Sequence, residues 1–170
     1  MTLIRPEQSR DVVGIRAVNE AAFDTSTEAD IVDMLRRNCE QFISFVAVEQ
    51  EVVGHILFTP VTIDSQSEQT VGMGLAPLAV SPQQQRRGIG CLLVERGLAE
   101  LRSRAVPFVV VLGHPEFYGR FGFMRASNLG LTCQWNVPDE AFMAIILDRT
   151  AMDGVAGIAR YRPEFDAAVS

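Results

Sequence analysis

The chain has 170 residues, of which 48% are hydrophobic and 21% charged, with a formal net charge of −6. A chain of this length and apolar content can bury a core, so disorder and a coiled coil are excluded and one globular domain is expected. All 15 cationic residues are arginines. Because lysine is absent, mechanisms that need a side-chain primary amine, such as a Schiff base or a Walker phosphate loop, are excluded.

The spacing of the cysteines and the N-terminal sequence indicate the cellular compartment and the kinds of site that are expected. Cys39, Cys91 and Cys133 lack Cys-x-x-Cys spacing, so neither a disulfide framework nor a zinc site is expected. The first residues lack the apolar segment of a signal peptide, and no later run approaches the ~20 apolar residues of a membrane span. We therefore expect a cytoplasmic protein with no metal and no membrane partner.

Positive charge is concentrated in one segment of this acidic chain. Residues 81–130 contain seven arginines and three glutamates, a net charge of +4, whereas the whole chain carries −6. A nucleic-acid groove would draw cations from several segments, so no nucleic-acid partner is expected. A local anionic ligand fits the pattern better.

The first part of the chain predicts a strand, two helices and a hairpin. Leu3 and Ile4 predict a short opening strand, and apolar residues recur at helical spacing in residues 9–23 and 28–38. Aromatic and β-branched runs at residues 42–49 and 52–63 predict two antiparallel strands.

The rest of the chain predicts a mixed sheet. A strand at residues 70–80 contains Pro77, so a bulge or an unpaired stretch is expected there. A helix follows to about residue 104, and the apolar run 107–113 predicts a central strand buried on both faces. The remaining predicted elements are one helical turn beginning at Pro115 and strands at 141–148 and 157–161. These elements predict an α+β fold with one mixed, mostly antiparallel sheet flanked by helices.

The segment before the long helix is a candidate anion-binding loop. Residues 85–90 have the sequence Gln-Arg-Arg-Gly-Ile-Gly and connect the end of a strand to the start of a helix. Backbone N–H groups and the helix dipole favour a pyrophosphate at such a position. Gly88 and Gly90 permit close approach, and Arg86 and Arg87 add positive charge. A glycine at a helix start also fits a simple turn, and the lack of a third glycine disfavours a dinucleotide-binding fold.

The order of elements and two motifs resemble the GNAT superfamily of acetyl-CoA-dependent N-acetyltransferases. One motif is the Gln-x-x-Gly-x-Gly loop at residues 85–90, and the other is Tyr118, four residues before Gly122 and Phe123. The string at residues 117–123 looks like a bacterial branch of predicted acetyltransferases. The resemblance implies a single GNAT domain over residues 1–170, with a core at about 3–148 and a tail at 149–170. It also implies that strands four and five splay apart around acetyl-CoA.

The resemblance implies a role for individual residues. The backbone N–H of Leu78 would stabilise the oxyanion, and Tyr118 would act as the general acid that protonates the departing thiolate. Tyr118 also fits a simple aromatic core position. The residues implied in acetyl-CoA binding are Leu78, Ala79, Val80, Gln85, Arg86, Arg87, Gly88, Ile89, Gly90, Cys91 and Tyr118.

The general base is left open by the sequence. Glu28, His55 and Glu68 are candidates, a water-mediated base is equally compatible, and each side chain also fits a non-catalytic role. His114 fits a helix-capping role better than a chemical one.

The leading expectation is an N-acetyltransferase that moves acetyl from acetyl-CoA to a primary amine by direct attack on the thioester. The alternative is a non-catalytic acyl-CoA-binding regulatory module. The acceptor, a small molecule or a protein, stays open, as does the oligomeric state, for which a homodimer is one option.

Overall fold

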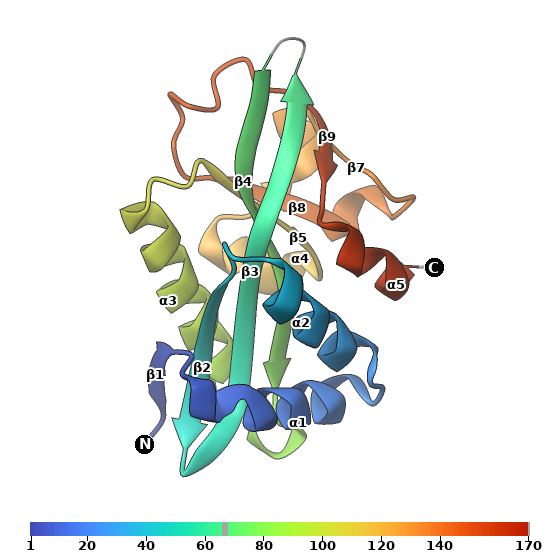
Figure 1. The fold of residues 1–170 in the computed structure, drawn as a ribbon. Helices are drawn as coiled ribbons and strands as arrows, with labels where there is room; N and C mark the ends of the chain where they lie inside the picture. Colours follow the sequence, from blue (N-terminus) through green and yellow to red (C-terminus); the bar gives the residue numbers. More distant parts are fainter. Residues whose placement is uncertain (66–67, 170) are drawn as a thin grey trace. The chain divides into compact units, whose positions relative to one another are not determined.

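The computed structural model describes residues 1–65 and 68–169. Within them the chain forms a mixed α/β fold whose strands are mostly antiparallel, with helices flanking the sheet (Figure 1). The chain divides into two compact units that alternate along the sequence. Unit 1 comprises Met1–Phe58, Pro77–Ala99 and Pro163–Ser170, and unit 2 comprises Thr59–Ala76 and Glu100–Arg162.

Unit 1 contains the N-terminal strands and the long helices. Its elements are β1 (Leu3–Pro6), η1 (Ser9–Asp11), α1 (Val12–Phe23), α2 (Thr27–Asn38), β2 (Ile43–Glu49), the first part of β3 (Glu51–Ser65), the end of β4 (Glu68–Val80), η2 (Pro82–Gln84), most of α3 (Ile89–Ser103), η6 (Pro163–Phe165) and α5 (Asp166–Val169). The β1–β2 and β2–β3 pairs are both antiparallel.

Strand β3 is covered by helices on both faces within unit 1. The ring of His55 contacts Asn19 of α1, whereas a Cβ at the adjacent Gly54 would meet the side chain of Leu93 in α3. Successive side chains of a strand point to opposite faces, so α1 covers one face and α3 the other. Close packing of α3 depends on Gly97, because a Cβ there would lie 2.4 Å from the ring of Phe58.

Unit 2 contains the shorter strands. Its elements are the end of β3, most of β4, β5 (Phe108–Leu112), α4 (Pro115–Tyr118), η3 (Gly119–Phe121), β6 (Met124–Arg125), η4 (Ala126–Leu129), β7 (Leu131–Cys133), η5 (Asp139–Ala141), β8 (Phe142–Ile146) and β9 (Gly157–Arg160). Strand β8 lies antiparallel to both β5 and β6. Strand β9 is parallel to β7 and antiparallel to β3.

The pairing of β4 with β5 is parallel and short. Residues 73–75 of β4 pair with residues 109–111 of β5, whereas β4 itself continues to Val80. Residues 108–111 are buried, as expected for a central apolar strand. Pro77 follows the paired stretch. Proline has no backbone N–H, and at this position no hydrogen bond to β5 is lost. The pairing thus ends just before Pro77, where a bulge or an unpaired stretch was expected.

The predicted fold class is confirmed, and most predicted boundaries lie within a few residues of the observed ones. Strands β6 and β7 were not predicted, because they have only two and three residues and show no period. The predicted helix at 9–23 begins with the 3-10 turn η1 before α1.

The described residues, 1–65 and 68–169, were searched for membrane-spanning helices and for metal-binding groups. No helix there combines the length and apolar content needed to cross a membrane. In the same residues, no group of three or more His, Cys, Asp or Glu side chains is arranged to hold a metal ion.

Candidate functional site

The loop before α3 has the backbone geometry of an anion-binding site. Arg86 and Gly88 have φ angles of +66° and +84°, so two left-handed residues flank one position of the turn. Turns of this kind can direct successive N–H groups into one concavity that binds anions. The loop leads into α3 at Ile89, and the first N–H groups of a helix have no acceptor within it. A Cβ at Gly88 would meet no atom within 4 Å, so the space beside the loop is open.

The two arginines of the loop differ in their surroundings. Both nitrogens Nη1 and Nη2 of Arg87 donate to the carboxylate of Glu49, at 3.1 and 3.0 Å, and Nη1 also donates to Gln84. The hydrogen bond from Arg87, followed by one from Thr2, lowers the pKa of Glu49 below its usual value. Both arginines are exposed to solvent, so the difference between them is the pairing of Arg87 with Glu49. Arg87 is therefore held by the protein, and its charge is offset by Glu49.

The end of β4 is tied to this loop. The side-chain amide of Gln85 donates to the carbonyl of Val80 at 3.1 Å, and the N–H of Ser81 donates to the carbonyl of Val53 at 2.8 Å. Gln85 thus fixes the loop against the strand. The burial of the other predicted residues alternates: Ala79 and Ile89 are buried, whereas Leu78, Val80, Gly90 and Cys91 are partly exposed.

Tyr118 lies in unit 2, at the end of α4. Its ring makes edge contacts with Phe117 and Phe123, at centroid distances of 4.9 and 5.6 Å. The ring also packs over Gly113, where a Cβ would lie 2.3 Å from it. Burial raises the pKa of Tyr118 to about 12, so the phenol stays protonated at neutral pH. It is able to donate a proton and is a poor base.

His114 precedes this turn and is exposed. It occupies the N-cap position of α4, but its side chain makes no capping hydrogen bond. Its carbonyl accepts from the N–H groups of Phe117 and Tyr118, both at 3.1 Å. The predicted capping role is therefore wrong for the side chain, and the carbonyl of His114 accepts the first hydrogen bonds of the turn.

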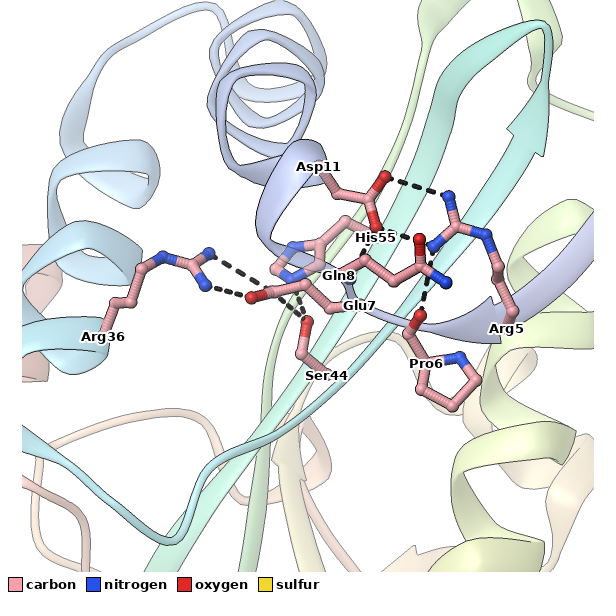
Figure 2. Close-up of polar contacts among 8 residues, drawn as sticks. All are labelled: Arg5, Pro6, Glu7, Gln8, Asp11, Arg36, Ser44 and His55. Atoms are coloured by element: carbon pink, nitrogen blue, oxygen red, sulfur yellow. Dashed lines mark hydrogen bonds and ion pairs between the residues drawn. The ribbon is translucent and has the colours of Figure 1, made fainter.

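His55 lies at the centre of a polar cluster in unit 1, which we call the His55 cluster: Glu7, Asn19, Arg36, Ser44 and His55. Asn19, Ser44 and His55 are buried, and Figure 2 shows His55 with Glu7, Arg36 and Ser44. The amide nitrogen of Asn19 donates to the carbonyl of Ile15 at 2.9 Å and lies 3.1 Å from Nδ1 of His55. Since that nitrogen is a donor, Nδ1 accepts and Nε2 carries the proton.

This tautomer of His55 sets the direction of the hydrogen bonds in the rest of the cluster. Nε2 of His55 donates to Oγ of Ser44 at 3.0 Å, and the hydroxyl of Ser44 donates to Oε1 of Glu7 at 2.6 Å. Arg36 pairs with the same carboxylate. His55 is fully buried, and burial, with a smaller contribution from Arg36, lowers its pKa to about 3. Both ring nitrogens are used inside the protein, so we do not propose His55 as the general base.

The two candidate carboxylates differ in burial. Glu68 is exposed at the start of β4. Glu28, in the first turn of α2, has one shielded oxygen, Oε2, with no hydrogen-bond partner among the described residues. Of the two, only Glu28 presents an oxygen that is both shielded and available.

The structure separates the predicted residues by unit: the end of β4, the loop, Glu28 and His55 belong to unit 1, and Glu68 and Tyr118 to unit 2. Sequence reasoning missed Glu49, the partner of Arg87, because the two residues lie 38 positions apart and no local motif joins them.

An anion nest at the start of a helix is typical of proteins that bind phosphorylated ligands. The chain belongs to the GNAT family of N-acetyltransferases: a model of the acetyltransferase (GNAT) domain matches residues 3–126.

The relatives agree with this family. YhbS from Escherichia coli strain K12, an uncharacterized N-acetyltransferase, is 36% identical over 166 residues, which cover 96% of this chain and 98% of the relative. The crystal structure of YhbS in complex with CoA has a TM-score of 0.90 at 35% identity and covers 97% and 92% of the two chains. A GNAT acetyltransferase from Brucella melitensis in complex with acetyl-CoA has a TM-score of 0.79 at 33% identity, covering 98% and 99%.

Proposed function

We propose that the protein transfers the acetyl group of acetyl-CoA to a primary amine by direct attack of the amine on the thioester. The observation that carries the proposal is the anion nest at Arg86 and Gly88, at the start of α3. Relatives that are 35% and 33% identical bind CoA and acetyl-CoA, respectively.

The loop residues fit the diphosphate of acetyl-CoA. The space beside Gly88 is open, the N–H groups at the start of α3 lack helical acceptors, and Arg86 supplies an exposed positive charge. Because Arg87 is held by Glu49, we assign it to loop geometry rather than to charge neutralisation. The full set proposed to bind acetyl-CoA is Leu78, Ala79, Val80, Gln85, Arg86, Arg87, Gly88, Ile89, Gly90, Cys91 and Tyr118.

Two residues of the chain take the proposed chemical roles. Acetyl-CoA, when bound, supplies a thioester carbonyl that accepts the amine. The N–H of Leu78 donates to the carbonyl oxygen as negative charge develops on it. The N–C bond forms, the C–S bond breaks, the amine gives up one proton, and Tyr118 gives its proton to the leaving sulfur. Solvent then restores the proton of Tyr118.

The amine proton leaves to water or to Glu28. The shielded oxygen of Glu28 favours this carboxylate over the exposed Glu68. An amine that arrives uncharged needs no strong base at this step.

We further propose that residues 1–170 act as one acetyltransferase domain in the cytoplasm. Strands β3 and β4 each run from one unit into the other, which supports a single functional domain.

The test is thiol release from acetyl-CoA across a panel of primary amines, together with calorimetric binding of acetyl-CoA. We expect acetyl-CoA to bind and at least one amine to release thiol above the rate of hydrolysis. Tight binding with no turnover for any small or peptide amine would favour the regulatory-module alternative and refute transfer.

A further inference from the structure

The strained turn at Arg86 is held through the side chains of both neighbouring residues, all within unit 1. Arg86 has a φ of +66°, a left-handed conformation that is unfavourable for a residue with a side chain and persists where the surrounding structure enforces it. The side chain of Gln85 donates to the carbonyl of Val80 at the end of β4. The side chain of Arg87 pairs with Glu49, the last residue of β2. Two strands thus hold the loop on either side of its strained residue.

The pairing of Arg87 with Glu49 is the stronger of these two anchors. Nη1 and Nη2 of Arg87 donate to different oxygens of the Glu49 carboxylate, at 3.1 and 3.0 Å, whereas the bond from Gln85 is single and uncharged. The carboxylate also accepts from the hydroxyl of Thr2, and the side chain of Glu49 is only 16% exposed. Glu49 is therefore itself held in place. Arg87 is 49% exposed, so solvent weakens the pair and a moderate effect is expected.

The anchored residue lies at the centre of the candidate diphosphate site. Arg87 stands between the two left-handed residues, Arg86 and Gly88, and α3 begins at Ile89. A loop that is already held in one conformation binds its ligand more tightly than a loop that must become ordered on binding, because ordering costs free energy. Anchoring Arg87 therefore favours ligand binding by the whole turn.

We propose that Glu49 is a positioning residue for acetyl-CoA: through its pairing with Arg87, it holds the loop at residues 85–90 in the conformation that binds the diphosphate. The inference rests on the acetyl-CoA site proposed above. In this role Glu49 acts through Arg87 and does not touch the ligand.

The charge of Glu49 separates this role from a direct electrostatic effect. A carboxylate near a diphosphate repels it, so removal of the negative charge alone would raise the affinity for acetyl-CoA. Loss of a positioning residue lowers the affinity instead, because the loop then becomes ordered only on binding. The sign of the change distinguishes the two effects.

The experiment is calorimetric titration of Glu49→Gln with acetyl-CoA, accompanied by steady-state thiol release. Glu49→Gln should weaken acetyl-CoA binding about fivefold and raise the KM for acetyl-CoA by a similar factor, while kcat at saturating acetyl-CoA stays unchanged. Urea unfolding checks that the variant is folded. Equal or tighter binding of acetyl-CoA by Glu49→Gln would overturn the inference.

Glu51→Gln is the matched control. Glu51 lies opposite Glu49 across the β2–β3 hairpin, is exposed, and is not the partner of Arg87. Its substitution removes the same charge from the same hairpin and should change acetyl-CoA affinity by less than about twofold. A loss as large as that of Glu49→Gln would refute the assignment of Glu49.

A double-mutant cycle tests whether Glu49 acts through Arg87. In an Arg87→Gln background the partner is absent, so the further change Glu49→Gln should alter acetyl-CoA affinity by less than about twofold. A fivefold loss in both backgrounds would contradict the proposed route.

The unmodified protein separates this inference from the proposed function. If it does not bind acetyl-CoA, both fail. If it binds acetyl-CoA and Glu49→Gln binds as tightly, this inference fails and the transfer reaction stands. If it binds acetyl-CoA without turnover, transfer is refuted, and the calorimetric comparison with Glu49→Gln decides this inference alone.

Discussion

The loop at residues 85–90 and the His55 cluster, both within unit 1, use polar groups in opposite ways. In the loop, two residues have left-handed φ angles, a helix starts, and the space beside Gly88 is open. In the His55 cluster, each step from Asn19 to Glu7 pairs a donor with an acceptor inside the protein. The loop is a candidate site for a ligand, whereas the hydrogen bonds of the cluster hold α1 and α2 to the sheet and leave Asn19 Oδ1 and Arg36 Nε without a partner among the described residues.

This difference distinguishes polar residues that stabilise the fold from polar residues that are available to a ligand. The sequence alone does not distinguish them. A histidine on a strand and a glycine-arginine loop both suggest chemistry. Burial removes the histidine from reach and lowers its pKa, whereas exposure and backbone geometry leave the loop able to bind an anion. Substitutions in the loop should therefore alter ligand binding, and substitutions in the cluster should alter stability.

The largest expected effect is that of Gly88→Glu on acetyl-CoA binding. The added carboxylate repels the diphosphate, and φ of +84° strains any side chain, so several charged hydrogen bonds are lost and affinity falls about 1000-fold. Calorimetry measures the change. Gly154→Glu is the matched control, because Gly154 has φ of +72° and equally open surroundings. Similar losses in both variants would mean that backbone strain, and not the ligand site, is responsible.

His55→Ala should lower the free energy of unfolding by about 3 kcal/mol, because it leaves a cavity and removes the partners of Asn19 and Ser44. Urea unfolding measures the change. The exposed His114→Ala should change it by less than about 0.5 kcal/mol. Acetyl-CoA affinity of folded His55→Ala should stay near that of the unmodified protein; a selective loss of affinity would contradict the comparison.

Tyr118→Phe should lower kcat about 100-fold and leave acetyl-CoA affinity unchanged, because it removes a proton and keeps the ring over Gly113. Steady-state thiol release with saturating amine measures kcat, and calorimetry measures affinity. Phe117→Leu, a change in the same aromatic group, controls for repacking. Full activity of Tyr118→Phe would refute the proton-donor role.

Stability should fall on acidification because of His55. The pKa of His55 is about 3 in the folded protein and near 6.5 in the unfolded chain. Below pH 6.5, His55 therefore becomes protonated in the unfolded chain and stays neutral in the folded protein. The contribution is fully present above pH 6.5, and by pH 5 about 2 kcal/mol of it is lost. Urea unfolding of the unmodified protein and of His55→Gln from pH 7.5 to 5 measures it. An identical slope in both proteins would contradict the lowered pKa.

Features formed by residues that are close together in the sequence were predicted, and features formed by residues far apart in the sequence were not. The loop was predicted because its glycines, arginines and helix start lie within a few consecutive residues. Asn19 and His55 are 36 positions apart, and Arg87 and Glu49 are 38, so no pattern could join them. Strand β7 has only three residues and is too short for a periodic signal.

The sequence by itself determined the fold class, the position of the glycine-arginine loop before a helix and the family resemblance, because hydrophobic period, glycine positions and helix starts are local properties of the chain. Only the tertiary structure decided that His55 is neutral and buried and that Arg87 is held by Glu49. Each of these depends on which distant segments exclude water from a group or supply its partner, and local sequence does not encode that.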